Sequence, residues 1–281
     1  MPTLANSVWL ISGCSTGFGR EIALAALEGG AQVAVTARNP GSVTDICERF
    51  PGRALALPLD VSSATAIATC VEATLAHFGR IDALVNNAGY GYVAAIEEGE
   101  EQAVRALFEV NFFGALALTQ AVLPVMRRQR SGHIINNSSQ AGIMANPGTG
   151  YYSASKYALE GLMEALQKEV APLGIRVTSV QPGAFRTDWS GRSMQRSPVV
   201  IADYAQVHER LDMIAAIDGK QPGDPVRAAR IFIDLYTMPE PPVQLILGRG
   251  ALATYRAKLA QVSTGLDRLE DLTIAADYPP T

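Results

Sequence analysis

The stretch Val8-Trp9-Leu10-Ile11-Ser12-Gly13-Cys14-Ser15-Thr16-Gly17-Phe18-Gly19 decides which fold this chain is expected to adopt. Four apolar residues typical of a buried strand lead directly into a glycine-rich turn, and a helical pattern follows over residues 20–27. Glycines let the backbone of such a turn approach a pyrophosphate, and the first N–H groups of the helix are free to bind the anion. The stretch therefore predicts a strand, a phosphate-binding turn and a helix.

The glycine spacing in this turn is Gly13-x-x-x-Gly17-x-Gly19, which differs from the standard dinucleotide fingerprint. An isolated turn of this kind also serves as a plain corner between a strand and a helix. Its position after the first strand and before the first helix is the context that a dinucleotide site requires. We interpret Cys14 as a small residue of the turn and not as a reactive thiol.

Six more short apolar runs alternate with longer helical patterns along the chain. Strands that alternate with helices indicate βαβ units and a parallel sheet covered on both faces. We find no internal repeat, low-complexity segment or linker. The pattern predicts an α/β fold with a Rossmann-type, doubly wound, mostly parallel sheet of seven strands, in a single domain over residues 1–281. The six further strands are expected at residues 33–35, 54–57, 81–85, 133–135, 175–180 and 243–247.

Composition narrows the classes of function. The 281 residues are 48% hydrophobic and 18% charged, with a net charge of -4, so the core can be large and nothing suggests a nucleic acid partner. The first residues lack the basic region and apolar core of a signal peptide, and the longest apolar run, residues 112–126, is too short to span a bilayer comfortably. Three cysteines without metal-binding spacing fit a reducing cytoplasm, and we expect no metal site.

The end of the second predicted strand bears on the choice of cofactor. An acidic residue at this place binds the ribose of NAD, whereas an arginine accommodates the extra phosphate of NADP. Here Ala37 leaves no carboxylate, and Arg38 supplies a planar cation. The sequence therefore favours NADP(H) over NAD(H), and the alternative is that Arg38 is an ordinary solvated charge.

Two later loops carry polar side chains at strand ends. Asp60 follows the third predicted strand and either caps the next helix or accepts a hydrogen bond from an adenine amino group. The segment Asn86-Asn87-Ala88-Gly89 follows the fourth strand, at the edge of a parallel sheet where ligands collect. The alternative role of these amides is to hold the loop by hydrogen bonds to its backbone.

A candidate acid–base pair lies further along the chain. If the segment after Gly150 is helical, Tyr152 and Lys156 share one face, and the ammonium stands close to the phenol. A nearby cation lowers the pKa of a phenol, which is otherwise about 10, and suits it to proton transfer at a carbonyl. Ser139 follows the fifth predicted strand and can bring a hydroxyl to the same oxygen. The Tyr–Lys spacing alone also occurs as an exposed, solvated pair.

A long helical pattern over residues 98–128 contains Asn111 and Gly114 among apolar residues. Both residue types lower helix propensity, which predicts a kink that frees backbone carbonyls to hold water. Pro124 marks a second expected irregularity.

Taken together, these residues make the chain similar to the classical short-chain dehydrogenases/reductases, and its ending resembles that of the hydroxysteroid and retinol dehydrogenase-like members. The interval of 13 residues between Ser139 and Tyr152 is the family's usual one and selects them over Ser138 and Tyr151. The motifs that carry the resemblance, in family order, are the turn from Ser12 to Gly19, Asn86-Asn87-Ala88-Gly89, Asn111, Ser139, Tyr152-x-x-x-Lys156 and Pro182-Gly183.

The resemblance implies a catalytic tetrad of Asn111, Ser139, Tyr152 and Lys156. Tyr152 would donate a proton to a carbonyl oxygen, Ser139 would hold that oxygen, and Lys156 would bind the nicotinamide ribose and lower the pKa of Tyr152. Asn111 would anchor a water that relays protons. The cofactor-binding residues that the resemblance implies are Gly13, Ser15, Gly17, Phe18, Gly19, Arg38, Asp60, Val61, Asn87, Gly89, Tyr152, Lys156, Pro182, Gly183, Phe185 and Thr187.

Two positions depart from the family pattern. Ser12 stands where threonine is usual, and Asn137 stands where an apolar residue is usual. A buried amide at Asn137 needs hydrogen-bond partners, and it either shapes the substrate pocket or stabilises the loop.

Beyond residue 187 the pattern loosens. Loops and small helices after catalytic strands are where substrate lids lie, so we expect a lid over residues 188–220. Trp189, Met194 and Met213 are candidate pocket residues or plain core residues. Asp224-Pro225 predicts a helix start, and a helix over residues 251–260 is expected before a tail rich in Asp, Leu and Pro.

The combined prediction is an NADP-dependent oxidoreductase that interconverts an alcohol and a ketone or aldehyde, acting on CH–OH groups. We expect a small, largely apolar substrate, a cytoplasmic homodimer or homotetramer that associates through long helices, no nucleic acid partner and no membrane span. Two alternatives stay open: a sensor that binds NADP without turnover, and an epimerase or dehydratase on the same scaffold. The intact tetrad argues against the first, and the glycine spacing argues against the second.

Overall fold

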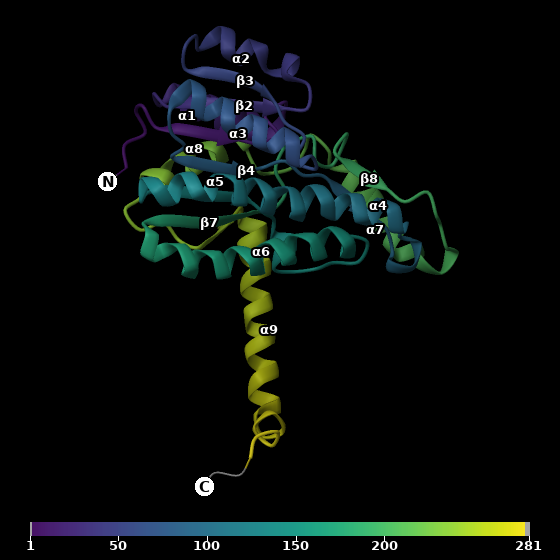
Figure 1. Cartoon of the computed structure of the whole chain (residues 1–281). Coiled ribbons are helices and arrows are strands. Elements are labelled where there is room, and N and C mark those ends of the chain that lie inside the picture. The colour runs from purple at the N-terminus through teal and green to yellow at the C-terminus, as the bar shows by residue number, and fades with distance from the viewer. Residues whose placement is uncertain (1, 279–281) are drawn as a thin grey trace.

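The computed structural model describes residues 2–278 and contains a seven-stranded sheet in the order β3-β2-β1-β4-β6-β7-β9 (Figure 1). Every pair of neighbouring strands in it is parallel. All seven predicted strands are present, although the fourth begins at Ala83 and not at residue 81. The strands are β1 (Val8–Ile11), β2 (Gln32–Ala37), β3 (Ala54–Pro58), β4 (Ala83–Asn86), β6 (Gly132–Asn137), β7 (Ile175–Pro182) and β9 (Gln244–Leu247).

Helices cover both faces of this sheet. They are α1 (Gly17–Glu28), α2 (Thr44–Arg49), α3 (Ala64–Phe78), α4 (Glu101–Phe108), α5 (Ala115–Gln129), α6 (Gly150–Val170), α7 (Ala205–Ala216), α8 (Pro225–Thr237) and α9 (Arg249–Ile274). Because side chains alternate along a strand, Trp9 and Ile11 pack with α1 and α8, while Leu10 packs with α3, α5 and α6. All three are fully buried, so β1 lies at the centre of both core layers.

The strand order reverses beside β1. From β1 the chain passes to β2 on one side and later to β4 on the other. The loops that leave the carboxyl ends of β1 and β4 therefore diverge and leave a crevice, which is where ligands bind in open α/β sheets. The glycine turn after β1 and the loop after β4 both lie at this crevice.

The long helical pattern after residue 98 consists of α4, a π-helical turn (Glu109–Gly114) and α5. The predicted kink at Asn111 is present as this turn, whereas Pro124 lies inside α5 without ending it. Within residues 2–278, Glu101–Gln129 is the one helical stretch that is long and apolar enough to resemble a membrane span, with a mean hydropathy of 1.5 over an 18-residue window. It packs against α3 and the sheet, and core helices of folded domains pass the same test.

A small second sheet supports the region that was predicted to be a lid. Strand β5 (Gly91–Val93) pairs in parallel with β8 (Met194–Arg196). Val93 packs with Val207 and Leu211 of α7, which gives residues 188–220 a small apolar core that rests on the segment after β4 (Figure 1). Strands of three residues carry too little periodicity to be predicted from sequence.

The C-terminal helix differs from the prediction. We expected a helix over residues 251–260 and then a tail, but α9 continues unbroken to Ile274. Its first turn packs against β9, with Ala251 buried, and after Lys258 nearly every described residue is exposed. The helix therefore projects from the body as a stalk (Figure 1).

Candidate functional site

A cavity of about 950 Å³ opens at the carboxyl ends of β1, β4, β6 and β7. This volume is at the upper end of the usual range for ligand pockets. Two predicted site residues, Gly19 and Asn111, lie behind the wall. The predicted residues that line the cavity are Gly13, Ser15, Gly17, Phe18, Arg38, Asp60, Val61, Asn87, Gly89, Ser139, Tyr152, Lys156, Pro182, Gly183, Phe185 and Thr187.

The glycine turn is shaped for close approach of a ligand to the backbone. Gly13 and Gly17 have positive φ angles of 73° and 59°, a conformation that glycine adopts without strain. A Cβ on Gly19 would collide with the carbonyl oxygen of Gly13, so Gly19 packs beneath the turn. No side chain caps the first N–H groups of α1 at Thr16. This cradle fits the diphosphate of a dinucleotide.

Ser12 ties the turn to the loop after β4. Its hydroxyl accepts hydrogen bonds from the backbone N–H groups of Asn87 at 2.9 Å and Ala88 at 3.0 Å. The Asn87 side-chain amide donates to the carbonyl oxygens of Ser12 and Gly13. A serine hydroxyl therefore suffices at this position, and Asn87 both holds the loop and lines the cavity.

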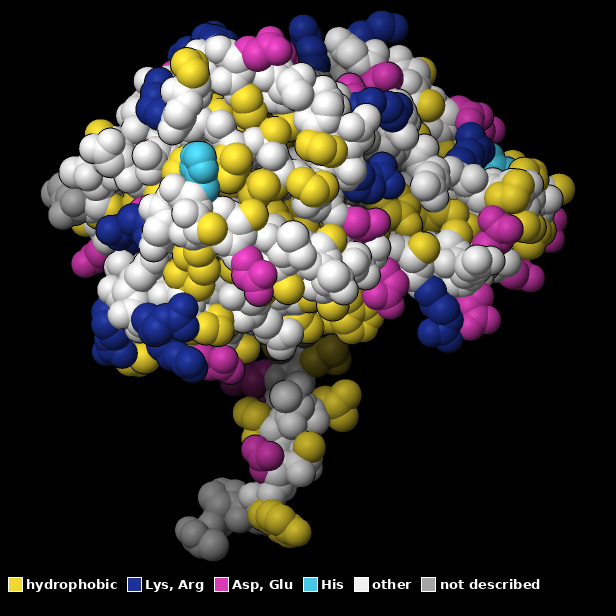
Figure 2. Space-filling view, turned by 45° about the horizontal axis from the view of Figure 1, so that its top comes forward, with side chains coloured by type: hydrophobic (Ala, Val, Ile, Leu, Met, Phe, Trp, Pro, Cys, Tyr) yellow, Lys and Arg dark blue, Asp and Glu magenta, His cyan; other side chains and the backbone are white. Residues whose placement is uncertain are grey.

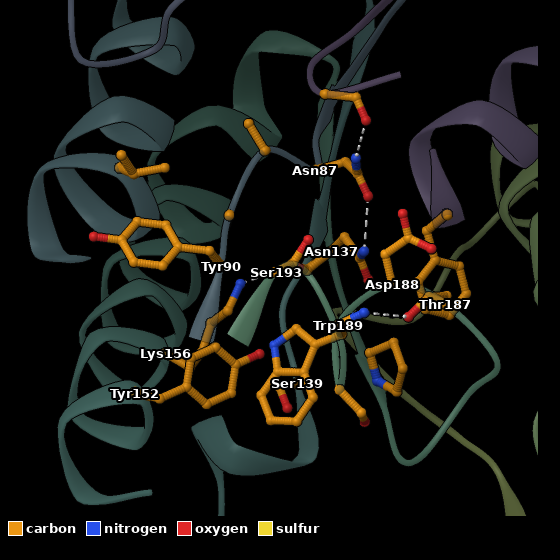
Figure 3. A pocket seen from close by; sticks show the side chains of 18 of the residues that line it. Asn87, Tyr90, Asn137, Ser139, Tyr152, Lys156, Thr187, Asp188, Trp189 and Ser193 are labelled. Carbon is orange, nitrogen blue, oxygen red and sulfur yellow. Dashed lines mark hydrogen bonds between the residues drawn. The ribbon is translucent and has the colours of Figure 1, made fainter. Parts of the chain in front are cut away.

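Asn137 fulfils both roles that the sequence left open. Its side-chain amide donates to Asn87 Oδ1 at 2.9 Å, which stabilises the loop after β4 (Figure 3). The residue also lines the cavity. In addition, its carbonyl oxygen accepts a hydrogen bond from Lys156 Nζ at 3.0 Å, so Asn137 positions the ammonium group.

Tyr152 extends into the cavity from α6, next to Ser139 and Trp189 (Figure 3). Burial raises the pKa of Tyr152 to about 12, and the nearby side chains of Ser139 and Trp189 oppose this shift only in part. Lys156 Nζ lies 5.9 Å from the centroid of the tyrosine ring. The pKa of Tyr152 is therefore raised and not lowered as expected, because the loss of solvation of the phenolate outweighs the effect of the Ser139 and Trp189 side chains.

Lys156 is also perturbed by burial. The pKa of its ammonium is lowered from 10.5 to about 8 by desolvation, and the carboxyl group of Glu160 opposes this shift. Glu160 lies one turn further along α6, its pKa is raised by burial, and it accepts a hydrogen bond from Gln244 Nε2 at 3.1 Å. Sequence analysis missed Glu160, although its spacing of four residues from Lys156 is a signal that could have found it.

Ser139 and its neighbour Ser138 both line the cavity, whereas Tyr152 lines it and Tyr151 does not. Ser139 follows β6 and caps a short 3₁₀ helix, since its hydroxyl accepts from the Ala141 N–H at 3.0 Å. The Ser138 hydroxyl lies beside Glu160. Tyr151 lies outside the cavity wall, and its hydroxyl donates to the carbonyl oxygen of Ile96 at 2.5 Å.

Asn111 lies in the π-helical turn behind the cavity wall. Its side chain fixes the backbone of Tyr90, donating to the carbonyl oxygen at 2.9 Å and accepting from the N–H at 3.0 Å. A Cβ placed on Gly89 would lie 3.1 Å from Asn111 Oδ1 and 3.9 Å from Lys156 Nζ, so both side chains meet behind Gly89. The side-chain amide of Asn111 is therefore engaged with Tyr90. The predicted binding of a relay water falls to the backbone carbonyls of this π-helical turn, and it stays a prediction.

Arg38 and Asp60 line the cavity after β2 and β3. Arg38 is exposed and forms no ion pair with the other described residues. Asp60 accepts hydrogen bonds from the N–H and hydroxyl of Ser62 at 3.0 and 2.6 Å, and these bonds lower its pKa. Asp60 is not the cap of the next helix, because Ser63 caps α3 by accepting from the Ala66 N–H.

The segment after β7 closes on the glycine turn. The ring of Phe185 packs on Phe18 at the start of α1, with the centroids 5.2 Å apart. A Cβ placed on Gly17 would lie 3.4 Å from the Cβ of Thr187. The segment predicted to contact the cofactor thus borders the phosphate cradle.

The three candidate pocket residues of the predicted lid lie in different surroundings. Trp189 covers Tyr152, with the ring centroids 5.2 Å apart, and its indole nitrogen is buried without a hydrogen-bond partner among residues 2–278. Met194 packs in the small core of the lid, and Met213 is 63% exposed. Trp189 therefore belongs to the pocket, and the two methionines do not line it.

Arg192 is a cavity residue that sequence analysis missed. Its guanidinium reaches from the lid to the glycine turn, where it donates to Thr16 Oγ1 at 2.8 Å, and it pairs with Asp188 at 2.6 Å. A single arginine in a loop carries no pattern that could have pointed to it. The contact places a cation beside the phosphate cradle.

The buried thiol of Cys14 takes no part in the site. Burial raises its pKa to about 12, which leaves the unreactive thiol form at neutral pH. This agrees with its interpretation as a small turn residue. No group of three or more His, Cys, Asp or Glu side chains suited to a metal ion is found in the described part of the chain.

A parallel Rossmann-type sheet with a glycine turn at its switch point defines a nucleotide-binding α/β protein. A family model described as short chain dehydrogenase matches residues 7–197. The chain belongs to this family of oxidoreductases.

Its similarity to known proteins extends over most of the chain. Oxidoreductase BOA17 of Botryotinia fuckeliana is 36% identical over 273 residues, which are 96% of this chain and 99% of that protein. A 3-ketodihydrosphingosine reductase of Bacteroides thetaiotaomicron is 42% identical over 181 residues, or 64% of this chain and 65% of that protein. The crystal structure of a short-chain dehydrogenase from Streptomyces avermitilis matches with a TM-score of 0.92 at 39% identity, and the match covers 98% of this chain and 100% of that one.

Proposed function

We propose that this protein is an NADP-dependent oxidoreductase that interconverts an alcohol and a ketone or aldehyde, with Tyr152 as general acid and base. The observation that carries the proposal is the meeting of Ser139, Tyr152 and Lys156 in the same cavity as the glycine turn. A phenol, a second hydroxyl and a cation beside a dinucleotide cradle form the arrangement that carbonyl reduction needs.

A bound nicotinamide dinucleotide would supply the hydride chemistry. Tyr152 donates its proton to the carbonyl oxygen, and a pKa of about 12 keeps it protonated at neutral pH. Ser139 donates a second hydrogen bond to that oxygen. Lys156, held by the Asn137 carbonyl, stabilises the phenolate that Tyr152 becomes. In the direction of oxidation, the phenolate form of Tyr152, stabilised by Lys156, accepts the proton of the alcohol.

The proposed preference for NADP(H) rests on the end of β2. Ala37 is apolar there. The guanidinium of Arg38 lines the cavity, forms no ion pair with another described residue, and can bind a second phosphate. Arg192, at the glycine turn, adds a second cation on the phosphate side. Gly13, Gly17 and the uncapped start of α1 would hold the diphosphate.

For the substrate we propose a small, largely apolar carbonyl compound or alcohol. Trp189, Tyr90, Ile214 and Ile217 contribute apolar surface to the cavity. The name of the 3-ketodihydrosphingosine reductase relative is consistent with a lipid-like ketone. We further propose a single domain with residues 188–220 as its lid, association as a homodimer or homotetramer, and residence in the cytoplasm.

Replacement of Tyr152 by Phe tests the reaction. We expect kcat/KM for reduction to fall by roughly a hundred- to ten-thousandfold, the usual contribution of a positioned acid, while NADPH affinity stays nearly constant. NADPH consumption should be followed with a panel of ketones, aldehydes and quinones. Tyr151→Phe is the matched control, because its hydroxyl contacts Ile96 outside the cavity, and it should retain turnover.

The same experiment separates the enzyme from the sensor. Turnover that survives in Tyr152→Phe would assign the acid to another residue. Tight binding of NADPH without turnover of any panel member in either direction, in wild type and both variants, would favour a protein that senses NADP.

A further inference from the structure

The stalk carries an apolar face that nothing in the described chain covers. From residue 252 onward, apolar residues recur at alternating intervals of three and four, which is the heptad repeat of coiled coils. Leu259, Leu266 and Leu269 in this series are 52%, 63% and 43% exposed. Figure 2 shows hydrophobic side chains along the projecting helix. We call this series the stripe; it consists of Leu252, Tyr255, Leu259, Val262, Leu266 and Leu269.

The helix has little support of its own. Its first turn packs on the body, but Gly265 and Thr264 in its middle both lower helix propensity. Helices in proteins gain most of their stability from packing an amphipathic face. A straight helix of 26 residues with an exposed stripe therefore indicates that a partner covers the stripe.

We propose that the stripe packs against the stripe of a second copy of this chain, and that the two α9 helices run antiparallel as a coiled coil. The distribution of charge selects this occupant, since the first half of the helix is basic and the second half is acidic except for Arg268. An antiparallel pair brings unlike halves together, whereas a parallel pair would bring like halves together. The basic residues are Arg249, Arg256 and Lys258, and the acidic residues are Asp267, Glu270 and Asp271.

One pair of charges defines the register. Arg256 and Glu270 flank the stripe, seven residues before and seven residues after Ser263. In an antiparallel pair centred on Ser263, each Arg256 lies opposite Glu270 of the second copy. Both side chains are exposed, and neither forms an ion pair within the described chain, so both are free to pair between copies.

This register also accounts for the tip of the helix. Residues 249 and 277 are each fourteen positions from Ser263, so the tip of one helix reaches the base of the other. Leu272 and Ile274, 72% and 57% exposed, then face the body of the second copy. A membrane surface is a poorer occupant, because the acidic second half of the helix lacks the basic polar face that favours anionic lipid.

The test is the molar mass of the full chain in solution, measured by light scattering and sedimentation over a range of concentrations. Leu259→Asp with Leu266→Asp places charges in the stripe and should weaken association by on the order of a hundredfold or more. Ala257→Asp with Thr264→Asp is the matched control on the opposite face, with the same spacing, and should leave the mass unchanged. Circular dichroism and the melting temperature establish that each variant is folded.

A charge exchange tests the antiparallel register. Arg256→Glu alone and Glu270→Arg alone each set like charges opposite one another, and both should weaken association. The double variant restores unlike pairs and should associate as wild type does. The bodies of two chains can also associate through another face. In that case the molar mass of the stripe variant falls to half that of the wild-type assembly and not to that of one chain, and this result supports the proposal equally.

Three results would overturn the proposal. A mass that none of the stripe variants changes would remove α9 from any contact between copies. A double charge variant as weak as the two single variants would refute the antiparallel register. Binding of the wild type to anionic lipid vesicles that the stripe variant loses, with no change in mass, would assign the stripe to a membrane surface.

Discussion

At the scale of single residues, burial sets the protonation of the two central side chains. It raises the pKa of Tyr152 and lowers that of Lys156, because a phenolate and an ammonium both lose solvation in the cavity wall. Both groups are therefore shifted towards their neutral forms. At pH 7 Tyr152 is a proton donor. Lys156 is a cation at this pH, and burial of its charge lowers the free energy of unfolding.

This shift predicts a pH dependence of stability. The pKa of Lys156 in the folded state, about 8, lies below its ordinary value of 10.5, so the unfolded chain binds more protons between these values and the free energy of unfolding rises with pH across this window. Relative to Lys156→Met, the wild type should gain roughly 3 kcal/mol over that range, measured by urea denaturation. Lys168→Met, on the exposed face of the same helix, should track the wild type. A wild type that parallels Lys156→Met at every pH would contradict the shift.

At the scale of elements, Glu98 fastens the lid to the body. Its buried carboxylate accepts hydrogen bonds from the Ile201 N–H and from His208 Nε2, both at 2.7 Å, and its carbonyl oxygen accepts from the Ser197 hydroxyl at 2.6 Å. These contacts join the segment before α4 to the start and middle of the lid. They therefore hold residues 197–208 of the predicted lid against the segment before α4.

Glu98→Ala should release the lid. We expect amide hydrogen exchange over residues 197–211 to accelerate by roughly tenfold or more, and KM for the carbonyl substrate to rise. Glu100→Ala, an exposed neighbour, is the control. The hydrogen bond from Ile201 lowers the pKa of Glu98, so in the wild type this fastening is present at neutral pH and is lost as the pH falls through the lowered pKa. Unchanged exchange in Glu98→Ala would show that the apolar core of the lid alone holds it.

At the scale of the whole molecule, cofactor binding and folding are linked. A ligand that binds only the folded protein stabilises it by about 2.7 kcal/mol at a hundredfold excess over Kd. NADPH should therefore raise the melting temperature more than NADH at equal concentration. In Arg38→Asp the order should reverse, because the carboxylate repels the second phosphate and suits a ribose. Arg127→Asp, at the end of α5, should keep the order of the wild type, and an unchanged order in Arg38→Asp would remove Arg38 from the cofactor site.

Local patterns were sufficient to predict the main elements. Each of the seven strands has its own apolar run, the glycine turn has its own backbone requirement, and the Asp224 cap of α8 is a local hydrogen bond, so all were predictable. Prediction failed where the pattern was short or ambiguous. The strands β5 and β8 have three residues each, and the exposed half of α9 resembles a tail because its apolar residues face no core.

The sequence by itself determined which side chains could do chemistry, because the glycine turn and the spacing of Tyr152 and Lys156 follow from local geometry, while the resemblance to a known family selected Ser139 and Tyr152 over their neighbours. Tertiary structure decided how these groups behave. Burial is a property of the assembled core, so only the fold showed that desolvation raises the pKa of Tyr152. Contacts between segments distant in the sequence brought Arg192 to the site and engaged Asn111 with Tyr90, and no local pattern encodes such contacts.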